Sequence, residues 1–205
     1  MGLDIAIIRL MKKKLFTLFL VLVCGVANAA EFKTKAKSAF LIDYDSGTEI
    51  VAKNADKLMP PSSMIKLMTL AVLFDEIKAG NITLDTRFPV SENADYNDPK
   101  WYPASKICLS AGQTITVRDL ILGLIVQSGG DASVVVAEKL AGSEDAFTQL
   151  MEQKARSIGM EQSTFGNASG LPNPNNLMTS RELATLALHL IGDYPDLYPM
   201  FATKR

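Results

Sequence analysis

The chain is organised around residues 61–69, which read Pro-Ser-Ser-Met-Ile-Lys-Leu-Met-Thr. From Met64 to Phe74 every residue is apolar except Lys66 and Thr69. Two prolines stand before this run and block helix upstream of it. A helix that is apolar on nearly every face is buried rather than exposed, so we expect this segment to be a helix in the core.

The same pattern places the ends of the predicted helix. It indicates a helix from about Ser63 to Ala79, in which Ser62 or Ser63 can cap the start. Gly80 stands where a C-terminal glycine stop is expected.

Three polar residues recur every three positions in this helix: Ser63, Lys66 and Thr69. One turn separates Lys66 from Ser63, so the amine can reach the hydroxyl. Burial and the positive end of the helix dipole both favour a neutral amine, which can take the serine proton and make Ser63 a nucleophile. The Ser63 amide can help to hold a developing oxyanion. The alternative is that Ser63 only caps the helix and Lys66 extends to the surface.

Length and composition suggest one domain without a metal or a cofactor. The chain has 205 residues and a net charge of -1, so it carries no nucleic-acid-binding footprint. Its two cysteines, Cys24 and Cys108, and its single histidine, His189, have no metal-site spacing. A Ser-His-Asp triad built on His189 is disfavoured, because this residue lies in a predicted amphipathic helix.

The N-terminus has the pattern of an export signal. Residues 11–14 form a basic cluster, residues 15–26 an apolar stretch, and residues 27–29 a small-residue cleavage site. We therefore predict a signal peptide over residues 1–29, with Met11 as the start, and a mature protein in the periplasm or on the outer face of the cytoplasmic membrane. The alternative is an N-terminal membrane anchor.

The rest of the sequence predicts a hairpin followed by helices. Residues 39–43 and 48–52 are expected to be paired strands, and residues 81–115 a long, turn-rich segment. Helices beginning with Thr116, Asp131, Ser143 and Thr179 as caps are predicted to end near residues 127, 140, 158 and 191.

Ser128 stands at the glycine-bearing break between the helices predicted before and after it. A hydroxyl at such a break can point into a cavity. The alternative is a plain helix–helix turn.

The pair Ser63-x-x-Lys66, followed by Ser128-Gly129 after an apolar helix, resembles the first two signatures of the penicillin-binding, serine β-lactamase-like acyl transferases. Finer matches are similar to the low-molecular-mass D-alanyl-D-alanine carboxypeptidases, also called the S11 serine peptidases. These matches stand at residues 41–44, 46–47, 54–56, 66–69, 127–129, 131–132, 142–147 and 167–171. The resemblance covers nearly all of residues 36–205.

The resemblance implies an α/β (α+β) fold of the β-lactamase/transpeptidase type, with an antiparallel sheet and a helical lobe, over residues 30–205. It implies that Ser63 attacks the carbonyl between the two terminal D-alanines of a peptidoglycan stem peptide. Lys66 would be the base. Ser128 would pass a proton to the leaving amine or bond to Lys66. β-Lactams would be covalent inhibitors of the same serine.

The chain departs from the family pattern in two ways. The second signature is Ser-x-Asn, but the third position here is Gly130, and losing such a polar contact typically costs about 2–4 kcal/mol in catalysis. The third signature, Lys-Thr-Gly on a sheet strand, does not occur before Arg205. We therefore expect a domain truncated before the later strands, poorly stable and weakly active or inactive by itself. Membrane association is expected only through a C-terminal segment beyond that motif.

Two other functions remain open at this point. The chain can be a catalytically impaired peptidoglycan-binding remnant, because it has Gly130 and lacks the third signature. A serine β-lactamase of the same fold is less favoured, because the loop at residues 167–170 carries no deacylating glutamate.

Overall fold

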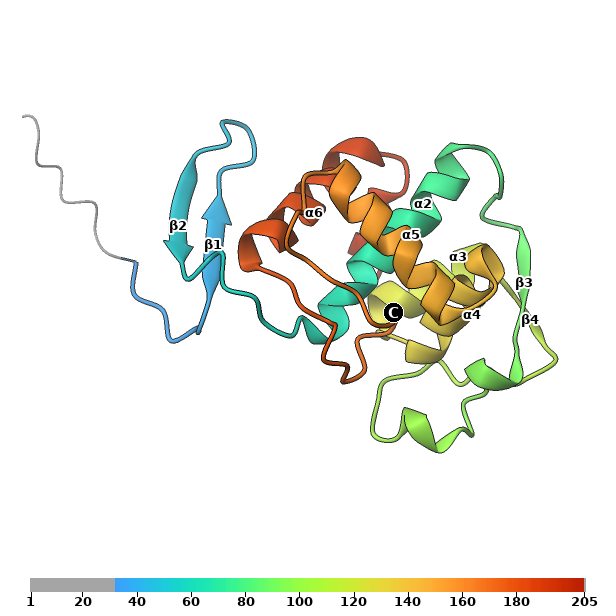
Figure 1. Cartoon of the computed structure of the whole chain (residues 1–205). Coiled ribbons are helices and arrows are strands. Elements are labelled where there is room, and N and C mark those ends of the chain that lie inside the picture. The colour runs from blue at the N-terminus through green and yellow to red at the C-terminus, as the bar shows by residue number, and fades with distance from the viewer. Residues whose placement is uncertain (1–31, 205) are drawn as a thin grey trace, which may run out of the picture. The chain divides into compact units, whose positions relative to one another are not determined.

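Helix α2 (Lys66–Lys78) runs through the middle of the computed structural model, which describes residues 32–204 (Figure 1). Four further helices pack against it: α3 (Val117–Val126), α4 (Gly130–Ala141), α5 (Glu144–Ser157) and α6 (Ser180–Asp193). The residues from Met68 to Phe74 are all buried, whichever face of α2 they occupy. The apolar run therefore forms the core helix that the sequence predicts.

The start of this helix differs from the prediction. Its first turn is a 3-10 turn, η1 (Ser62–Ile65), preceded by Pro61, and no side chain caps it. The prediction that Ser62 or Ser63 caps the helix is therefore wrong. Ser62, the first residue of this turn, has a left-handed backbone with φ of 50°. The predicted stop at Gly80 is confirmed, because Gly80 follows the C-cap residue with φ of 76°.

Three of the four other predicted caps are confirmed. The hydroxyls of Thr116, Ser143 and Thr179 each accept a hydrogen bond from the main-chain N–H three residues further on. The fourth prediction is wrong, because α4 begins one residue before Asp131 and has Gly129 as its N-cap. The Asp131 side chain bonds mainly to a different segment, described below.

The predicted hairpin forms as β1 (Ala39–Ile42) and β2 (Glu49–Lys53), paired antiparallel with a bulge between Leu41 and Ile42. Within the described residues this sheet has two strands only. Leu41 and Ile50 are 46% and 59% exposed, so apolar side chains of the hairpin remain uncovered here.

The segment at residues 81–115 contains more structure than its turn residues suggest. A second ribbon pairs β3 (Arg87–Pro89) with β4 (Thr114–Thr116), on the far side of the helices from the hairpin (Figure 1). Two 3-10 turns, η2 (Glu92–Ala94) and η3 (Pro99–Trp101), lie between these strands. The strands were missed because each is only three residues long. A last 3-10 turn, η4 (Tyr198–Ala202), follows α6.

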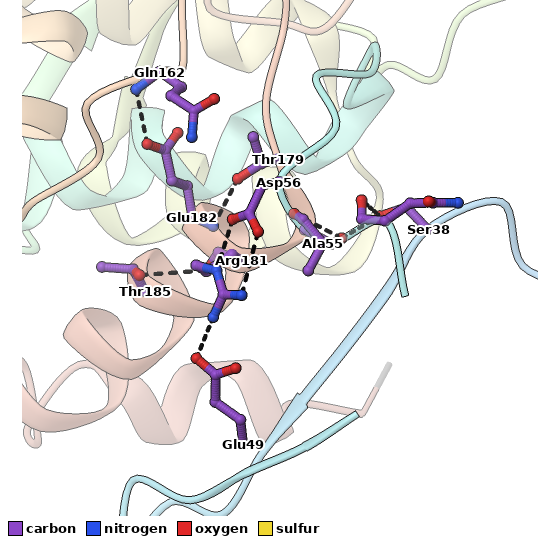
Figure 2. A network of polar contacts seen from close by, with 11 residues as sticks. Ser38, Glu49, Ala55, Asp56, Gln162, Thr179, Arg181, Glu182 and Thr185 are labelled. Carbon is purple, nitrogen blue, oxygen red and sulfur yellow. Dashed lines mark hydrogen bonds and ion pairs between the residues drawn. The ribbon is translucent and has the colours of Figure 1, made fainter. Parts of the chain in front are cut away.

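The first turn of α6 ties distant parts of the chain together (Figure 2). Arg181 binds Glu49 of the hairpin and Asp56, with an Nε–Oδ1 distance of 2.7 Å to Asp56. Glu182 is buried, and its carboxylate accepts the main-chain N–H groups of Gln162 and Ser163 at 2.8 Å each. The hairpin and the segment before the 167–170 loop are therefore both anchored at one helix end.

The predicted signal peptide at residues 1–29, including Met11 and Cys24, lies outside the described residues. Among the residues that are described, no helix combines the length and hydrophobicity needed to cross a membrane.

Candidate active site

Ser63 and Lys66 come together at the junction of η1 and α2. Ser63 is exposed, whereas Lys66 is only 5% exposed. The Nζ atom of Lys66 lies 3.3 Å from Ser63 Oγ, within hydrogen-bonding distance. A nucleophile and a base within reach of each other form the basic arrangement of covalent catalysis. The predicted one-turn spacing thus corresponds to a real contact.

The loop at residues 167–170 supplies a second partner for the amine. Lys66 donates a hydrogen bond to the main-chain carbonyl of Ser169, and Thr69 donates one to the carbonyl of Ala168 at 2.8 Å. The three polar residues of the helix therefore have their partners. Ser63 faces the surface, and the two buried ones bond to this loop.

The loop can approach the nucleophile only because residue 170 is glycine. Gly170 has φ of 80°, and a Cβ atom there would lie 2.2 Å from the carbonyl oxygen of Ser62 and 3.0 Å from the amide nitrogen of Ser63. The Asn167 side chain accepts the Gly170 N–H at 2.8 Å and closes the turn. Glycine at residue 170 therefore lets the loop pack directly on the turn that carries Ser63.

The environment of Lys66 suits it to act as a base. Burial lowers the pKa of Lys66 from 10.5 to about 8, while the negative charge of Asp131 acts in the opposite direction. Near neutral pH a fraction of the amine is therefore already uncharged, and it can accept the Ser63 proton without first losing its own to solvent.

Asp131 is fully buried and holds the segment that precedes β4. Its carboxylate accepts the N–H groups of Ile107 and Leu109, with shortest distances of 3.0 Å each. Cys108, between these two residues, is exposed, unpaired and in the left-handed region with φ of 62°. The carboxylate thus attaches an irregular segment to the first turn of α4.

Ser128 lies within the break between α3 and α4 and is partly buried, with φ of 57°. Among the described residues its hydroxyl forms no hydrogen bond with Ser63 or Lys66. The role of Ser128 in proton transfer therefore stays a prediction. The structure brings two of the three predicted site residues into contact.

A hollow of ≈ 430 Å³ adjoins the turn that carries Ser63. Its lining is Pro60, Ser62, Gly170, Leu171, Pro172, Asn173, Pro174 and Asn176. In the part of the chain that the structure describes, no three His, Cys, Asp or Glu side chains are placed to hold a metal ion.

Comparison with known proteins decides the family. A family model described as D-alanyl-D-alanine carboxypeptidase matches residues 25–205. The chain belongs to the D-alanyl-D-alanine carboxypeptidase family. The D-alanyl-D-alanine carboxypeptidase DacC of Escherichia coli is 35% identical over 192 residues, which cover 91% of this chain and 48% of that protein. DacF of Bacillus subtilis is 32% identical over 80% of this chain and 41% of that protein. The chain therefore spans about half the length of these relatives.

Solved structures of the carboxypeptidase family show the same fold. D-alanyl-D-alanine carboxypeptidase DacD from Francisella tularensis has a TM-score of 0.82 and 36% identity, covering 87% of this chain and 42% of that one. Penicillin-binding protein 5 from Haemophilus influenzae has a TM-score of 0.81 and 31% identity, covering 86% of this chain and 51% of that one. The predicted β-lactamase/transpeptidase-like fold class is confirmed.

Several residues that shape the site were not identified from the sequence. The carbonyls of Ala168 and Ser169 carry no signal of their own, because every residue has a carbonyl. The family match at residues 167–171 marks this loop, but nothing in it says which helix the loop contacts. Asp131 was interpreted as a cap, since its binding partners are more than twenty residues away.

Proposed function

We propose that this protein removes the terminal D-alanine from peptidoglycan stem peptides through an acyl-enzyme on Ser63. The observation that carries the proposal is the contact of 3.3 Å between Lys66 Nζ and Ser63 Oγ at the start of a buried helix. Membership of the carboxypeptidase family supports the choice of substrate. The chain spans about half the length of its relatives, and we propose that this half carries the activity by itself.

The reaction follows from the two side chains. Neutral Lys66 accepts the Ser63 proton while Oγ attacks the carbonyl carbon between the last two D-alanines. The C–N bond then breaks, and the proton reaches the leaving amine, a transfer that we assign to Ser128. Water hydrolyses the resulting ester and regenerates Ser63. A β-lactam ring opened by the same attack would leave a covalent adduct on this oxygen.

The place of action is part of the same proposal. Peptidoglycan lies outside the cytoplasmic membrane, and the sequence of residues 11–29 has the pattern of an export signal. We therefore propose a mature protein that acts in the periplasm or at the outer face of that membrane. The mass of the exported protein would show whether cleavage occurs after Ala29.

A single experiment tests the nucleophile. The intact mass of the exported protein is measured with and without benzylpenicillin, for the wild type, Ser63→Ala and the control Ser157→Ala, whose exposed hydroxyl lies at the end of α5. We expect an adduct on the wild type and the control and none on Ser63→Ala. An adduct that survives in Ser63→Ala, or no adduct on the wild type, would contradict the proposal.

A second candidate is a peptidoglycan-binding remnant, which Gly130 in place of the family asparagine favours. A pentapeptide ending in D-Ala-D-Ala separates the two functions. The enzyme would release D-alanine from it and lose this activity in Ser63→Ala. A remnant would bind the peptide equally well with and without the Ser63 hydroxyl and would release nothing.

A further inference from the structure

Trp101 occupies the space beside Gly130. A Cβ atom on Gly130 would lie 2.6 Å from Cζ3 and 3.1 Å from Cε3 of the Trp101 ring. The main-chain carbonyl of Ser105 would lie 3.4 Å from the same atom. The first distance is far shorter than any van der Waals contact, so residue 130 has no room for a side chain while the ring stays in place.

The ring cannot simply move away. Trp101 is 1% exposed, and its main-chain N–H donates to the Asp98 carbonyl at 3.0 Å, which closes the turn η3. The Asp98 side chain caps the same turn by accepting the Lys100 N–H at 2.9 Å, and the Lys100 amine lies 5.0 Å from the centre of the indole. When a new atom is added beside it, a rigid bicyclic side chain on a closed turn can move much less than the terminal atoms of a flexible side chain can.

The backbone that Trp101 contacts leads directly to Ser128. Two consecutive glycines, Gly129 and Gly130, separate this serine from the rest of α4, and glycines restrict the chain least. Residues 101–109, which we call the strap, hold the pair. The Gly130 N–H donates to Ser105 at 2.9 Å, and the Ile107 side chain would lie 3.1 Å from a Cβ atom on Gly129.

We propose that Trp101 is a positioning residue for Ser128: its indole packs on Gly130 and takes the space that the family's asparagine side chain would need. A side chain at residue 130 should then be tolerated only if the indole at residue 101 is replaced by a smaller side chain at the same time. The importance of Trp101 for catalysis rests on the proposed function, in which Ser128 transfers a proton. The packing itself does not depend on that function.

A stability cycle tests the packing. Melting temperatures are measured for Gly130→Ala, Trp101→Leu, the double variant and the control Gly123→Ala in both backgrounds. A Cβ atom on Gly123 would meet the flexible end of Ile107 at 2.8 Å. We expect Gly130→Ala to lower the melting temperature by about 4 °C or more in the wild type and by much less in Trp101→Leu. The control should lower it by a similar amount in the wild type and in Trp101→Leu, because its new Cβ atom would meet Ile107 and not the indole. Equal losses from Gly130→Ala in both backgrounds, or no loss in the wild type, would overturn the proposal.

Hydrogen exchange tests the positioning without requiring activity. In folded Trp101→Leu, we expect the amides of Gly129 and Gly130 to exchange at least about tenfold faster, because the glycine pair has lost its support. Trp101→Phe keeps an aromatic ring and should restore most of the protection. Exchange at the wild-type rate in Trp101→Leu would mean that the ring does not hold Ser128 in place.

Acylation by benzylpenicillin then connects the pair to catalysis. In Trp101→Leu the acylation step should slow by roughly tenfold or more, while reversible binding changes less, because a displaced proton carrier affects the chemical step. An unchanged acylation step would overturn the positioning role. A wild type that forms no adduct would contradict the proposed function, but the melting and exchange measurements would still decide whether Trp101 holds Gly130.

Discussion

The amine of Lys66 donates a hydrogen bond to the main-chain carbonyl of Ser169, 103 positions further along the chain. A carbonyl can accept a hydrogen bond but cannot take part in proton exchange with the amine. A neutral amine has two N–H groups and one lone pair. Since one N–H is directed to Ser169, the lone pair remains available toward Ser63 Oγ, 3.3 Å away.

The rate of acylation should depend on pH through Lys66. Burial lowers the pKa of Lys66 to about 8, so the fraction of neutral base rises tenfold per pH unit below that value and then levels off. We expect the rate of benzylpenicillin adduct formation to follow the same curve between about pH 6 and 9.5. A flat profile would show that Lys66 is not the group that accepts the proton.

The lowered pKa of Lys66 should also make the free energy of unfolding depend on pH. Between about pH 8 and 10.5 the unfolded chain keeps a proton on Lys66 that the folded chain has released, so the free energy of unfolding rises with pH. The rise is roughly 3 kcal/mol across this window. Urea unfolding of the wild type and Lys66→Met measures it, because only the wild type has the titrating amine. Parallel pH curves for the two proteins would contradict the shift.

Replacing Asp131 by asparagine should affect both stability and pH dependence. An amide nitrogen would face a main-chain N–H of Ile107, Leu109 or Ala132, at a cost of roughly 2–3 kcal/mol in unfolding free energy. Because the carboxylate also raises the pKa of Lys66, its loss should move the midpoint of the acylation profile to lower pH. The exposed Asp145→Asn, as a control, should cost less than about 1 kcal/mol. A midpoint that moves to higher pH would contradict the assigned role of Asp131.

Gly170→Ala should damage the site much more than a comparable glycine substitution elsewhere. Gly112 has almost the same backbone, with φ of 82°, but open space around it, so Gly112→Ala carries only the left-handed strain of about 1–2 kcal/mol. At Gly170 the new Cβ atom would also collide with the Ser62 carbonyl. We expect an additional loss of about 2 kcal/mol in urea unfolding, together with slower acylation of Ser63. Equal losses at the two positions would show that the contact with Ser62 is unimportant.

Glu182→Gln should destabilise the fold without touching the site. The buried carboxylate accepts a hydrogen bond from the main-chain N–H of Gln162 (Figure 2). It also accepts hydrogen bonds from the main-chain N–H and the hydroxyl of Ser163. An amide can keep only some of them, so we expect a loss of roughly 2–3 kcal/mol in unfolding free energy. Glu161→Gln, one position before Gln162 and exposed, should change stability by less than about 0.5 kcal/mol. Similar effects of the two substitutions would contradict this account.

Local patterns in the sequence predicted most of the elements. The apolar run at residues 64–74 indicated the core helix, and the hydroxyls of Thr116, Ser143 and Thr179 marked helix starts correctly, because capping involves only the next three residues. The strands β3 and β4 were missed, since three residues are too few to show an alternating pattern. The cap assigned to Asp131 was wrong, because competing N–H groups from a distant segment bind its carboxylate.

By itself the sequence determined that a serine and a lysine stand one helical turn apart on an apolar helix, because helix geometry fixes the distance between residues three apart. Only the tertiary structure decided how that pair is held. The Ser169 carbonyl behind Lys66 and the Trp101 ring on Gly130 are contacts between segments far apart in the chain. Such contacts depend on how helices and loops pack, and packing leaves no periodic trace in the residues that make them.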